Sequence, residues 1–273
     1  MSKKNDLDFL DEDKKLHSEI SKANAQATQE YENLGELKQG SKAWFHMRMG
    51  KFTGSKIPNL MKRGRSKADV FGETAKSVIR QVYIERDLTP EGAELYVDEM
   101  FNKRFRQTEW GNKYESYAIA AYEEATGNTV DPCAFKTHPI LDHIGGSFDG
   151  DVVGKKKIIE VKCPYDVLKH DANVQLSKGD YETGVPKTHE YYGQIQCNIF
   201  VGDAESCDFI SYDPRRKHDG LVIINVPRDN DYIEEMLDRI NFSEELIVKY
   251  LEYIDIDGAL LIMLNEKADA KTD

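Results

Sequence analysis

The stretch Gly146-Ser147-Phe148-Asp149-Gly150 is followed, after nine intervening residues, by Glu160-Val161-Lys162. The second segment continues an apolar run that is typical of a strand. Side chains alternate across a strand, so Glu160 and Lys162 project from one face and Val161 points the other way, into the core. Gly150 permits a bend, and a hairpin over 147–162 then brings Asp149 beside Glu160. Pro164 ends the strand, which places the charges at a sheet edge near loops.

Two neighbouring carboxylates, Asp149 and Glu160, repel each other unless a cation neutralises them. Hard oxygen ligands at a partly open site favour Mg²⁺ or Mn²⁺ over zinc. The ammonium of Lys162 would orient or deprotonate a water beside that metal, which lowers the pKa of the water and stabilises developing charge. The pattern therefore indicates phosphodiester hydrolysis. The spacing alone is also consistent with a hairpin that carries solvated charges on its outer face.

Around this hairpin, the pattern of apolar residues predicts helices, then strands, then helices. Helical spacing covers residues 68–86, 108–126, 188–202 and 231–254, and Gly127-Asn128 is a helix stop. Runs rich in Val, Ile and Phe predict strands at 144–153, 157–162, 206–212 and 221–226. The fold class is therefore α/β (α+β), with helices that flank a central mixed sheet. Residues 1–38 are expected to form an acidic polar arm, 39–254 the nuclease domain and 255–273 a tail whose apolar segment 259–264 docks on the core or on a neighbouring subunit.

The net charge of −12 argues against DNA binding until its distribution is considered. Most of the excess acid lies near the two ends, and residues 48–80 carry nine Lys and Arg against Asp69 and Glu73. Screening over about 8–10 Å lets such a basic segment contact phosphates, although it also fits an ordinary solvated face. No apolar run reaches the roughly 18 residues of a membrane span, and the start does not resemble a signal peptide, so a cytoplasmic protein is expected. Four cysteines without CxxC spacing are expected to be buried reduced thiols.

Taken together, seven short blocks resemble the lambda-type alkaline exonucleases of the PD-(D/E)XK nuclease superfamily, in the same order along about 70% of the chain. Each block alone is weak, whereas their order is specific. The blocks are Ala43-Trp44 with Met47-Arg48-Met49-Gly50, Thr53-Gly54-Ser55, Trp110-Gly111-Asn112-Lys113-Tyr114-Glu115, Ser147-Phe148-Asp149-Gly150, Ile159-Glu160-Val161-Lys162-Cys163-Pro164, Tyr191-Tyr192-Gly193-Gln194-Ile195-Gln196 and Tyr212-Asp213-Pro214-Arg215 with Lys217 and Gly220-Leu221.

The resemblance implies a restriction-endonuclease-like core, with a central mixed β-sheet flanked by helices, and a role for each matching residue. Asp149, Glu160 and the Val161 carbonyl would bind the metal, and Lys162 would position the nucleophilic water. Glu115 would be a further acid at the site, and Gln194 would hold the catalytic groups or the scissile phosphate. Arg48, Ser55 and Ser147 match positions that would bind phosphates at the 5′ end. Lys56, next to Ser55, and Tyr191, one turn before Gln194, are further expected contacts to DNA. A guanidinium with nearby hydroxyls is a sound phosphate pocket on physical grounds as well.

Each of these roles has a simpler alternative. Glu115 and Arg48 fit ordinary surface charges, and Ser55 fits a helix cap, which is compatible with phosphate binding. Trp44 fits a core residue better than a platform for base stacking. Gln194 and Gln196 are two apart on a presumed helix, so one of them faces the site, and the position in the block favours Gln194. Phe148 stands where the superfamily name calls for proline.

The resemblance further implies a Mg²⁺-dependent enzyme, with Mn²⁺ as a substitute, that degrades linear double-stranded DNA 5′→3′ and leaves 3′ single-stranded tails. It would act at DNA ends as a ring-shaped homotrimer, with a single-strand annealing protein, in phage-type recombination in the cytoplasm (that of the host if the gene is phage-borne). Two alternatives remain: an endonuclease of restriction or CRISPR-adaptation type, and a DNA-end-binding module without catalysis. The cysteine spacing disfavours the iron–sulfur cluster of many CRISPR-adaptation nucleases, and intact Asp149, Glu160 and Lys162 disfavour the inactive module.

Overall fold

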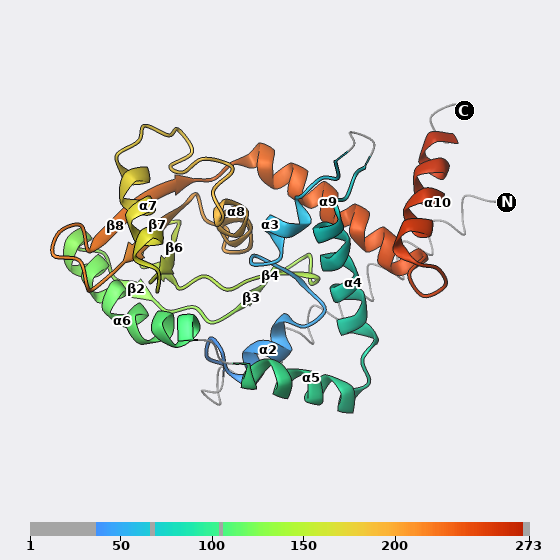
Figure 1. The fold of residues 1–273 in the computed structure, drawn as a ribbon, viewed down its shortest axis with the longest axis horizontal. Coiled ribbons are helices and arrows are strands. Elements are labelled where there is room, and N and C mark those ends of the chain that lie inside the picture. The colour runs from blue at the N-terminus through green and yellow to red at the C-terminus, as the bar shows by residue number, and fades with distance from the viewer. Residues whose placement is uncertain (1–36, 66–68, 104–105, 270–273) are drawn as a thin grey trace.

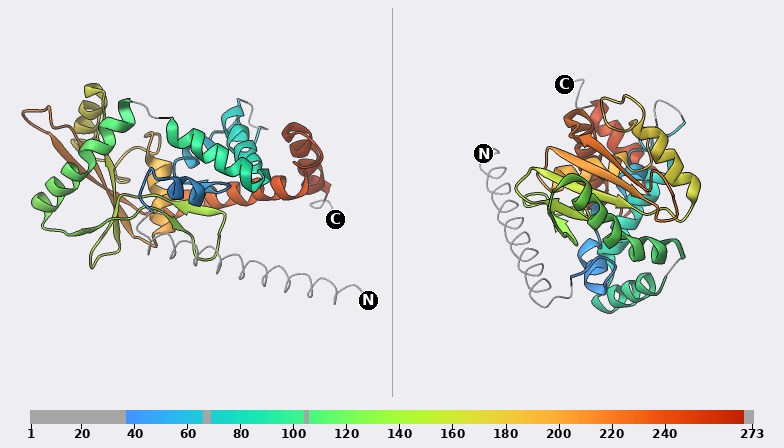
Figure 2. Two further views of the ribbon diagram at one scale, coloured as in Figure 1. Left: turned by 90° about the horizontal axis from the view of Figure 1, so that it is seen from below. Right: turned by 90° about the vertical axis from the view of Figure 1, so that its left-hand side faces the viewer.

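The computed structural model describes residues 37–65, 69–103 and 106–269 (Figure 1). Residues 1–36 of the expected acidic arm lie outside the described residues. A sheet with helices on both faces occupies one end of the molecule, and a group of packed helices occupies the other (Figures 1 and 2).

The main sheet has the strand order β2-β5-β6-β7-β8. Its strands are β2 (Val130–Asp131), β5 (Gly150–Val152), β6 (Lys157–Lys162), β7 (Ser206–Tyr212) and β8 (Leu221–Pro227). β6 and β7 are parallel, and the other neighbours are antiparallel, so the predicted mixed sheet is confirmed. A smaller sheet has the order β1-β4-β3 and contains β1 (Phe52–Thr53), β4 (Ile144–Gly146) and β3 (Lys136–Thr137).

The helices precede, separate and follow these strands. They are α2 (Lys42–Arg48), α3 (Ile57–Leu60), α4 (Glu73–Asp87), α5 (Pro90–Asn102), α6 (Arg106–Thr126), α7 (Val167–Ser177), α8 (Tyr192–Val201), α9 (Asn230–Lys249) and α10 (Ile256–Asp269). Gly127 ends α6 with φ +69°, as predicted, because glycine adopts this left-handed conformation without steric cost.

The two faces of the main sheet bury alternate residues of β6. Ile159 and Val161 pack in the core that α6 covers, and Ile158 packs in the core that α8 covers. Glu160 and Lys162 lie at the positions that alternate with Val161, so they share the α8 face. The prediction that Val161 faces the core and the two charges face the other way is therefore confirmed.

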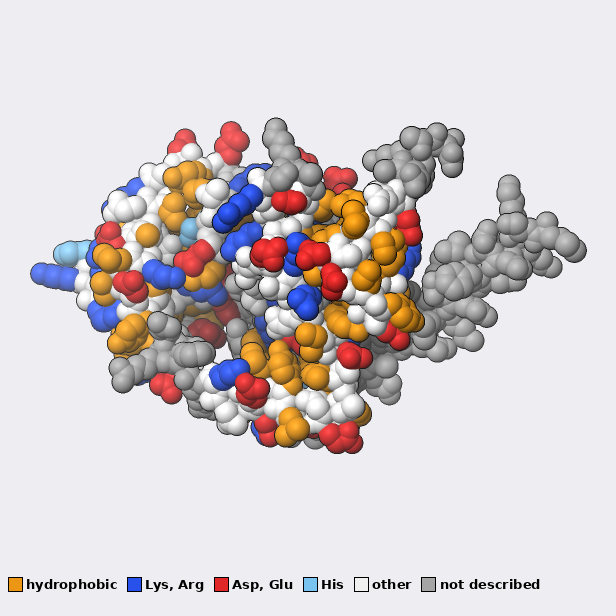
Figure 3. Space-filling view, turned by 45° about the vertical axis from the view of Figure 1, so that its right-hand side comes forward, with side chains coloured by type: hydrophobic (Ala, Val, Ile, Leu, Met, Phe, Trp, Pro, Cys, Tyr) orange, Lys and Arg blue, Asp and Glu red, His pale blue; other side chains and the backbone are white. Residues whose placement is uncertain are grey.

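The helical end of the molecule is built around α3, α4, α9 and α10. Ala259, Leu260 and Met263 of α10 are buried in this core, so the apolar segment expected to dock does so within the same chain. Leu261 of the same helix is 63% exposed. On the face in Figure 3, basic and acidic side chains are interspersed, and apolar side chains gather toward this end.

Some elements differ from the sequence prediction. The stretch 144–153, expected as one strand, is divided between β4 and β5 in different sheets, because the chain leaves the first sheet after Gly146. α5 and α7 were not predicted from periodicity. Local capping nevertheless signals both, since Thr89 precedes Pro90 and accepts from the amide of Gly92, and Asp166 accepts from that of Leu168.

Two expectations from composition can also be compared with the structure. All four cysteines lie in the described ranges and are free, and three are buried, which fits reduced thiols. Among the helices of the described ranges, none is long and apolar enough to cross a bilayer.

Arg239 of α9 ties the helical end together. Its side chain is buried and donates to the carbonyl oxygens of Leu60, Val70 and Lys62. Arg239→Ala would remove the donor from the Leu60 and Val70 carbonyls, whereas the Lys62 carbonyl keeps the amide of Gly72, and we expect the free energy of unfolding to fall by about 2–4 kcal/mol. Denaturant unfolding measures it. The exposed Arg63, paired with Glu235, is the matched control. Its replacement by alanine is expected to lower the free energy of unfolding by at most about 1 kcal/mol. Equal losses in the two variants would contradict the stabilising role of Arg239.

Candidate active site

The turn into β5 fixes Asp149 beside β6. The amide of Asp149 donates to the carbonyl of Ile159 (3.1 Å), and its Oδ2 accepts from the amide of Val161 (2.5 Å). Gly150 lies opposite Ile159 in the antiparallel ladder. The predicted hairpin therefore forms, and it buries the Asp149 and Glu160 carboxylates together.

Three side chains hold the Glu160 carboxylate. Lys162 Nζ lies 2.5 Å and Gln194 Nε2 2.6 Å from Oε1, and Asn198 Nδ2 donates to Oε2 at 2.9 Å. Asn198 also donates to the carbonyl of Ser147 (3.3 Å). Gln194 and Asn198 lie one turn apart on α8 and present the same face to the sheet.

Gln196 does not face this site. Its amide nitrogen donates to the carbonyl of Pro227, and its amide oxygen accepts from the amide of Asp229. Of the two glutamines, Gln194 is therefore the one that reaches the carboxylates, as expected. Asn198 was missed, although its spacing of four residues from Gln194 was a signal for it.

A cavity of about 360 Å³ opens onto this group and is lined by Glu115 of α6, Asp149, Val161, Lys162 and Tyr191, among others. Lys162 Nζ lies 5.0 Å from the centre of the Tyr191 ring. The structure thus brings Glu115, Asp149, Lys162, Gln194 and Tyr191 to one place from α6, the hairpin and α8.

The electrostatics of the cavity favour a bound cation. Burial, and then the neighbouring Glu160, raise the pKa of Asp149 well above its ordinary value. Burial and Glu160 also raise the pKa of Glu115, against the lowering effect of Lys162. Although burial lowers the pKa of Lys162, Glu160 and Asp149 outweigh it and raise that pKa overall. Negative charge on Asp149 and Glu115 is therefore unfavourable in the metal-free cavity, and a bound cation would relieve that cost.

These residues fit a hard divalent metal ion. Two buried carboxylates, Asp149 and Glu160, with the Val161 carbonyl offer the oxygen donors that Mg²⁺ and Mn²⁺ prefer. No cluster of three or more His, Cys, Asp and Glu side chains suited to a metal occurs in the part of the chain that the structure describes. A metal here would thus depend on two carboxylates and main-chain oxygen, with the remaining positions left to water and substrate.

A second polar cluster surrounds Arg48, at the end of α2. Its Nη1 donates to Ser147 Oγ (2.8 Å), and its Nη2 donates to Ser55 Oγ (2.8 Å) and Thr53 Oγ1 (3.4 Å). The guanidinium stacks 4.1 Å above the Trp44 ring. Burial lowers the pKa of Arg48 to about 10, which leaves it charged at neutral pH. A charged guanidinium surrounded by hydroxyl groups is suited to bind a phosphate.

The other polar residues around Arg48 are engaged with neighbouring side chains. Ser55 makes no cap bond to α3 and instead accepts from Arg48. Lys56 lines the same cavity as Arg48 and Ser55, but its ammonium lies 2.7 Å from Glu85. Trp44 is half-buried, and its indole N–H donates to Ser147 Oγ (3.0 Å), so it supports the cluster.

Residues 43–205 match the family model of the YqaJ-like viral recombinase domain. The chain belongs to this family. The match covers both polar clusters, from Arg48 to Gln194 and Asn198. The comparison with curated protein sequences finds no match.

Solved structures agree with this family. The alkaline exonuclease LHK-Exo from Laribacter hongkongensis is 25% identical and superimposes with a TM-score of 0.61, over 81% of this chain and 100% of that one. Its structure in complex with dAMP gives a TM-score of 0.62 at the same identity and coverage. A phage-related exonuclease from Haemophilus somnus shares the fold, at 21% identity and a TM-score of 0.52 over 71% of this chain and 92% of that one.

The resemblance to lambda-type alkaline exonucleases is therefore confirmed, and so is the restriction-endonuclease-like fold class. The protein is a nuclease of this kind, and its family supports a DNA exonuclease role.

Proposed function

We propose that the protein is a Mg²⁺-dependent exonuclease that degrades linear double-stranded DNA 5′→3′ and leaves 3′ single-stranded tails for recombination. One observation carries this proposal: Ser147 of the Arg48 cluster and Asp149 of the carboxylate pair are two residues apart. Their Cα atoms are at most about 7 Å apart. A terminal phosphate at Arg48 and a scissile phosphate at Asp149 would thus lie close together, as removal of one terminal nucleotide requires.

The catalytic part of the proposal assigns the chemistry to the hairpin and to α8. Asp149, Glu160 and the Val161 carbonyl would hold the metal, which when bound supplies Lewis acidity and a lowered pKa for the attacking water. Lys162 would position that water with its ammonium and offset charge on the scissile phosphate. Gln194 and Asn198 keep Glu160 in place.

Further residues complete the proposed site. Glu115, whose pKa is raised chiefly by burial, would serve as an additional acid in the cavity. Arg48, Ser55 and Ser147 would bind the 5′-terminal phosphate, and Lys56 and Tyr191 would lie along the path of the DNA strand.

The partners of the proposal follow from the resemblance. A ring-shaped homotrimer around the DNA, working with a single-strand annealing protein in the cytoplasm, would let a subunit with net charge −12 hold DNA on inward-facing basic surfaces. LHK-Exo in complex with dAMP supports a nucleotide as the product that this fold accommodates.

Metal-free stability tests Asp149 as a ligand. Between its ordinary and its raised pKa, the folded Asp149 keeps a proton that the unfolded chain has released, so the fold loses stability as pH rises through this window. Asp149→Asn removes that cost, and we expect the metal-free variant to be about 0.5–2 kcal/mol more stable at about pH 8. Below the ordinary carboxyl pKa of about 4 the difference should vanish.

Thermal unfolding with and without Mg²⁺ completes this test. Mg²⁺ should raise the melting temperature of the wild type, because it binds only the folded state, and should leave Asp149→Asn nearly unchanged. An equal rise in both proteins would remove Asp149 from the metal site.

The proposed exonuclease is tested against its alternatives with a linear duplex and a covalently closed circle of the same sequence. We expect release of mononucleotides from the linear DNA in Mg²⁺ and an intact circle. Cutting of the circle would show an endonuclease instead, and binding of ends without cutting would show an inactive end-binding module.

A further inference from the structure

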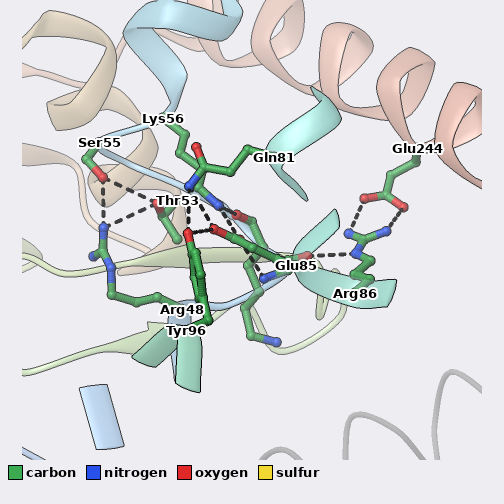
Figure 4. A network of polar contacts seen from close by, with 11 residues as sticks. Arg48, Thr53, Ser55, Lys56, Gln81, Glu85, Arg86, Tyr96 and Glu244 are labelled. Carbon is green, nitrogen blue, oxygen red and sulfur yellow. Dashed lines mark hydrogen bonds and ion pairs between the residues drawn. The ribbon is translucent and has the colours of Figure 1, made fainter. Parts of the chain in front are cut away.

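A buried acid lies behind the proposed phosphate pocket, on α4. Glu85 is 6% exposed. It lines a second cavity, separate from the one at Asp149 and also of about 360 Å³, that Arg48, Ser55 and Lys56 line as well. Its Oε2 accepts from the amide of Gly50 (2.9 Å) and from Lys56 Nζ (2.7 Å), and its Oε1 accepts from Gln81 Nε2 (2.7 Å) and Tyr96 OH (3.0 Å) (Figure 4).

Gly50 lies in the turn between Arg48 and the hydroxyl-bearing residues of the phosphate pocket. Arg48 precedes it on α2, and Thr53 and Ser55, whose hydroxyls Arg48 contacts, follow it. Gly50 has φ +70°, and a Cβ there would approach Arg86 Cγ to 2.8 Å, so the turn requires glycine. The geometry between guanidinium and hydroxyls therefore depends on this turn.

Neighbouring residues of α4 hold both polar groups of Gly50. Glu85 accepts from its N–H, and Arg86 Nε donates to its carbonyl (2.7 Å). On its far side, Arg86 makes a two-pronged ion pair with Glu244 of α9 (2.6 and 2.8 Å; Figure 4). The turn that follows Arg48 is thus held by α4 as well as by contacts within the pocket.

Glu85 also fixes Lys56. The ammonium donates both to Glu85 and to the carbonyl of Lys51 (3.1 Å), so it bridges α4 and the same turn. Burial raises the pKa of Glu85, but Lys56 and the other donors outweigh burial and lower that pKa overall. The Glu85 carboxylate therefore stays ionised.

We propose that Glu85 is a positioning residue for the phosphate pocket: by holding the Gly50 turn and Lys56, it presents Arg48 to the 5′-terminal phosphate and so sets the preference for phosphorylated ends. This inference rests on the proposed function, and it adds a residue on α4 that touches neither the reacting atoms nor the phosphate.

The test compares kcat/KM on linear duplexes with 5′-phosphate and 5′-hydroxyl ends. Glu85→Ala frees the turn and should reduce the phosphate preference by roughly ten- to a hundredfold, as displacements of about 1 Å do. Glu85→Gln can keep its oxygen toward Gly50 and Lys56 while the Gln81 amide and the Tyr96 hydroxyl reorient, so it should retain the preference within about threefold. Glu244→Ala is the matched truncation: it removes the ion pair to the Nη atoms of Arg86 but leaves Arg86 Nε on the Gly50 carbonyl, so it should lower the melting temperature and keep the preference.

The outcomes separate this inference from the proposed function. A wild type without phosphate preference would overturn the assignment of the 5′-phosphate pocket and, with it, this inference, whereas the exonuclease itself is tested by the linear and circular DNA. A wild-type preference that Glu85→Ala leaves unchanged, or that Glu244→Ala reduces equally, would overturn the role of Glu85 alone. If Glu85→Ala does not fold, Glu85→Asp keeps the charge near Lys56 but is too short to hold both Gly50 and Lys56, and it should show the same selective loss; a preference unchanged in Glu85→Asp would then overturn the inference.

Discussion

Lys162→Ala is expected to abolish DNA cleavage while end binding stays within a few-fold of wild type. Lys162 is the ammonium that contacts Glu160, and it lines the cavity with Asp149 and Glu115. Loss of a group that positions water and offsets transition-state charge lowers rates by about 10²–10⁴-fold. Single-turnover cleavage in Mg²⁺ measures the loss, and a gel-shift assay on the same duplex in Ca²⁺ measures binding.

Two controls keep this result interpretable. Lys155, in the β5–β6 turn, donates to Asn128 away from the cavity, and Lys155→Ala should cleave normally. Lys162→Met retains most of the aliphatic stem and should be as inactive as alanine, because the charge is what the site needs. Persistent cleavage in either Lys162 variant would show that the catalytic site lies elsewhere.

Arg48→Ala is expected to remove the preference for 5′-phosphorylated ends. The guanidinium supplies the charge of a cluster that otherwise holds the Ser55 and Ser147 hydroxyls. A hydrogen bond to a charged group contributes about 1.5–3 kcal/mol, which corresponds to a loss of roughly ten- to a hundredfold on phosphorylated ends. Rates on 5′-hydroxyl ends should change little, so the ratio of the two is the measurement.

Arg63→Ala is the matched control for Arg48, since Arg63 lies in the same basic segment but pairs with Glu235 on the surface. It should affect both end types alike and only weakly. Arg48→Lys should recover little of the preference, because a lysine lacks the planar fork that reaches two partners at once. Equal losses on both end types in Arg48→Ala would remove Arg48 from the phosphate pocket.

The catalytic hairpin was predictable because its information is local. Asp149 and Glu160 are eleven residues apart, so strand alternation and one glycine turn suffice to place them together. The apolar inner face of β6 fixes which side the charges occupy, and the structure confirms that side.

The phosphate cluster could not be derived in this way. Arg48 and Ser147 are 99 positions apart, and they meet only because the smaller sheet joins β1 to β4 in a parallel pair. Neither periodicity nor charge indicates that pairing, so the sequence placed these residues together only through the ordered family blocks.

Glu85 shows a different limit. Its position on α4 fits an ordinary amphipathic helix, and its partners Gly50 and Lys56 lie 35 and 29 positions earlier. Only the packed structure shows that four donors converge on this one carboxylate. Asn198, in contrast, was within reach of the sequence, since Gln194 had already been placed and helical spacing extends its face by one turn.

Digestion of a linear duplex that carries a label at one end of one strand at a time, with and without Mg²⁺, tests both the direction and the metal dependence of the exonuclease. We expect that, in Mg²⁺, 5′ labels are released at once as mononucleotides, while 3′ labels stay on long single strands until late in the digestion. Without Mg²⁺ neither label should be released. Early loss of the 3′ labels, or release in chelator, would contradict the proposed 5′→3′ metal-dependent exonuclease.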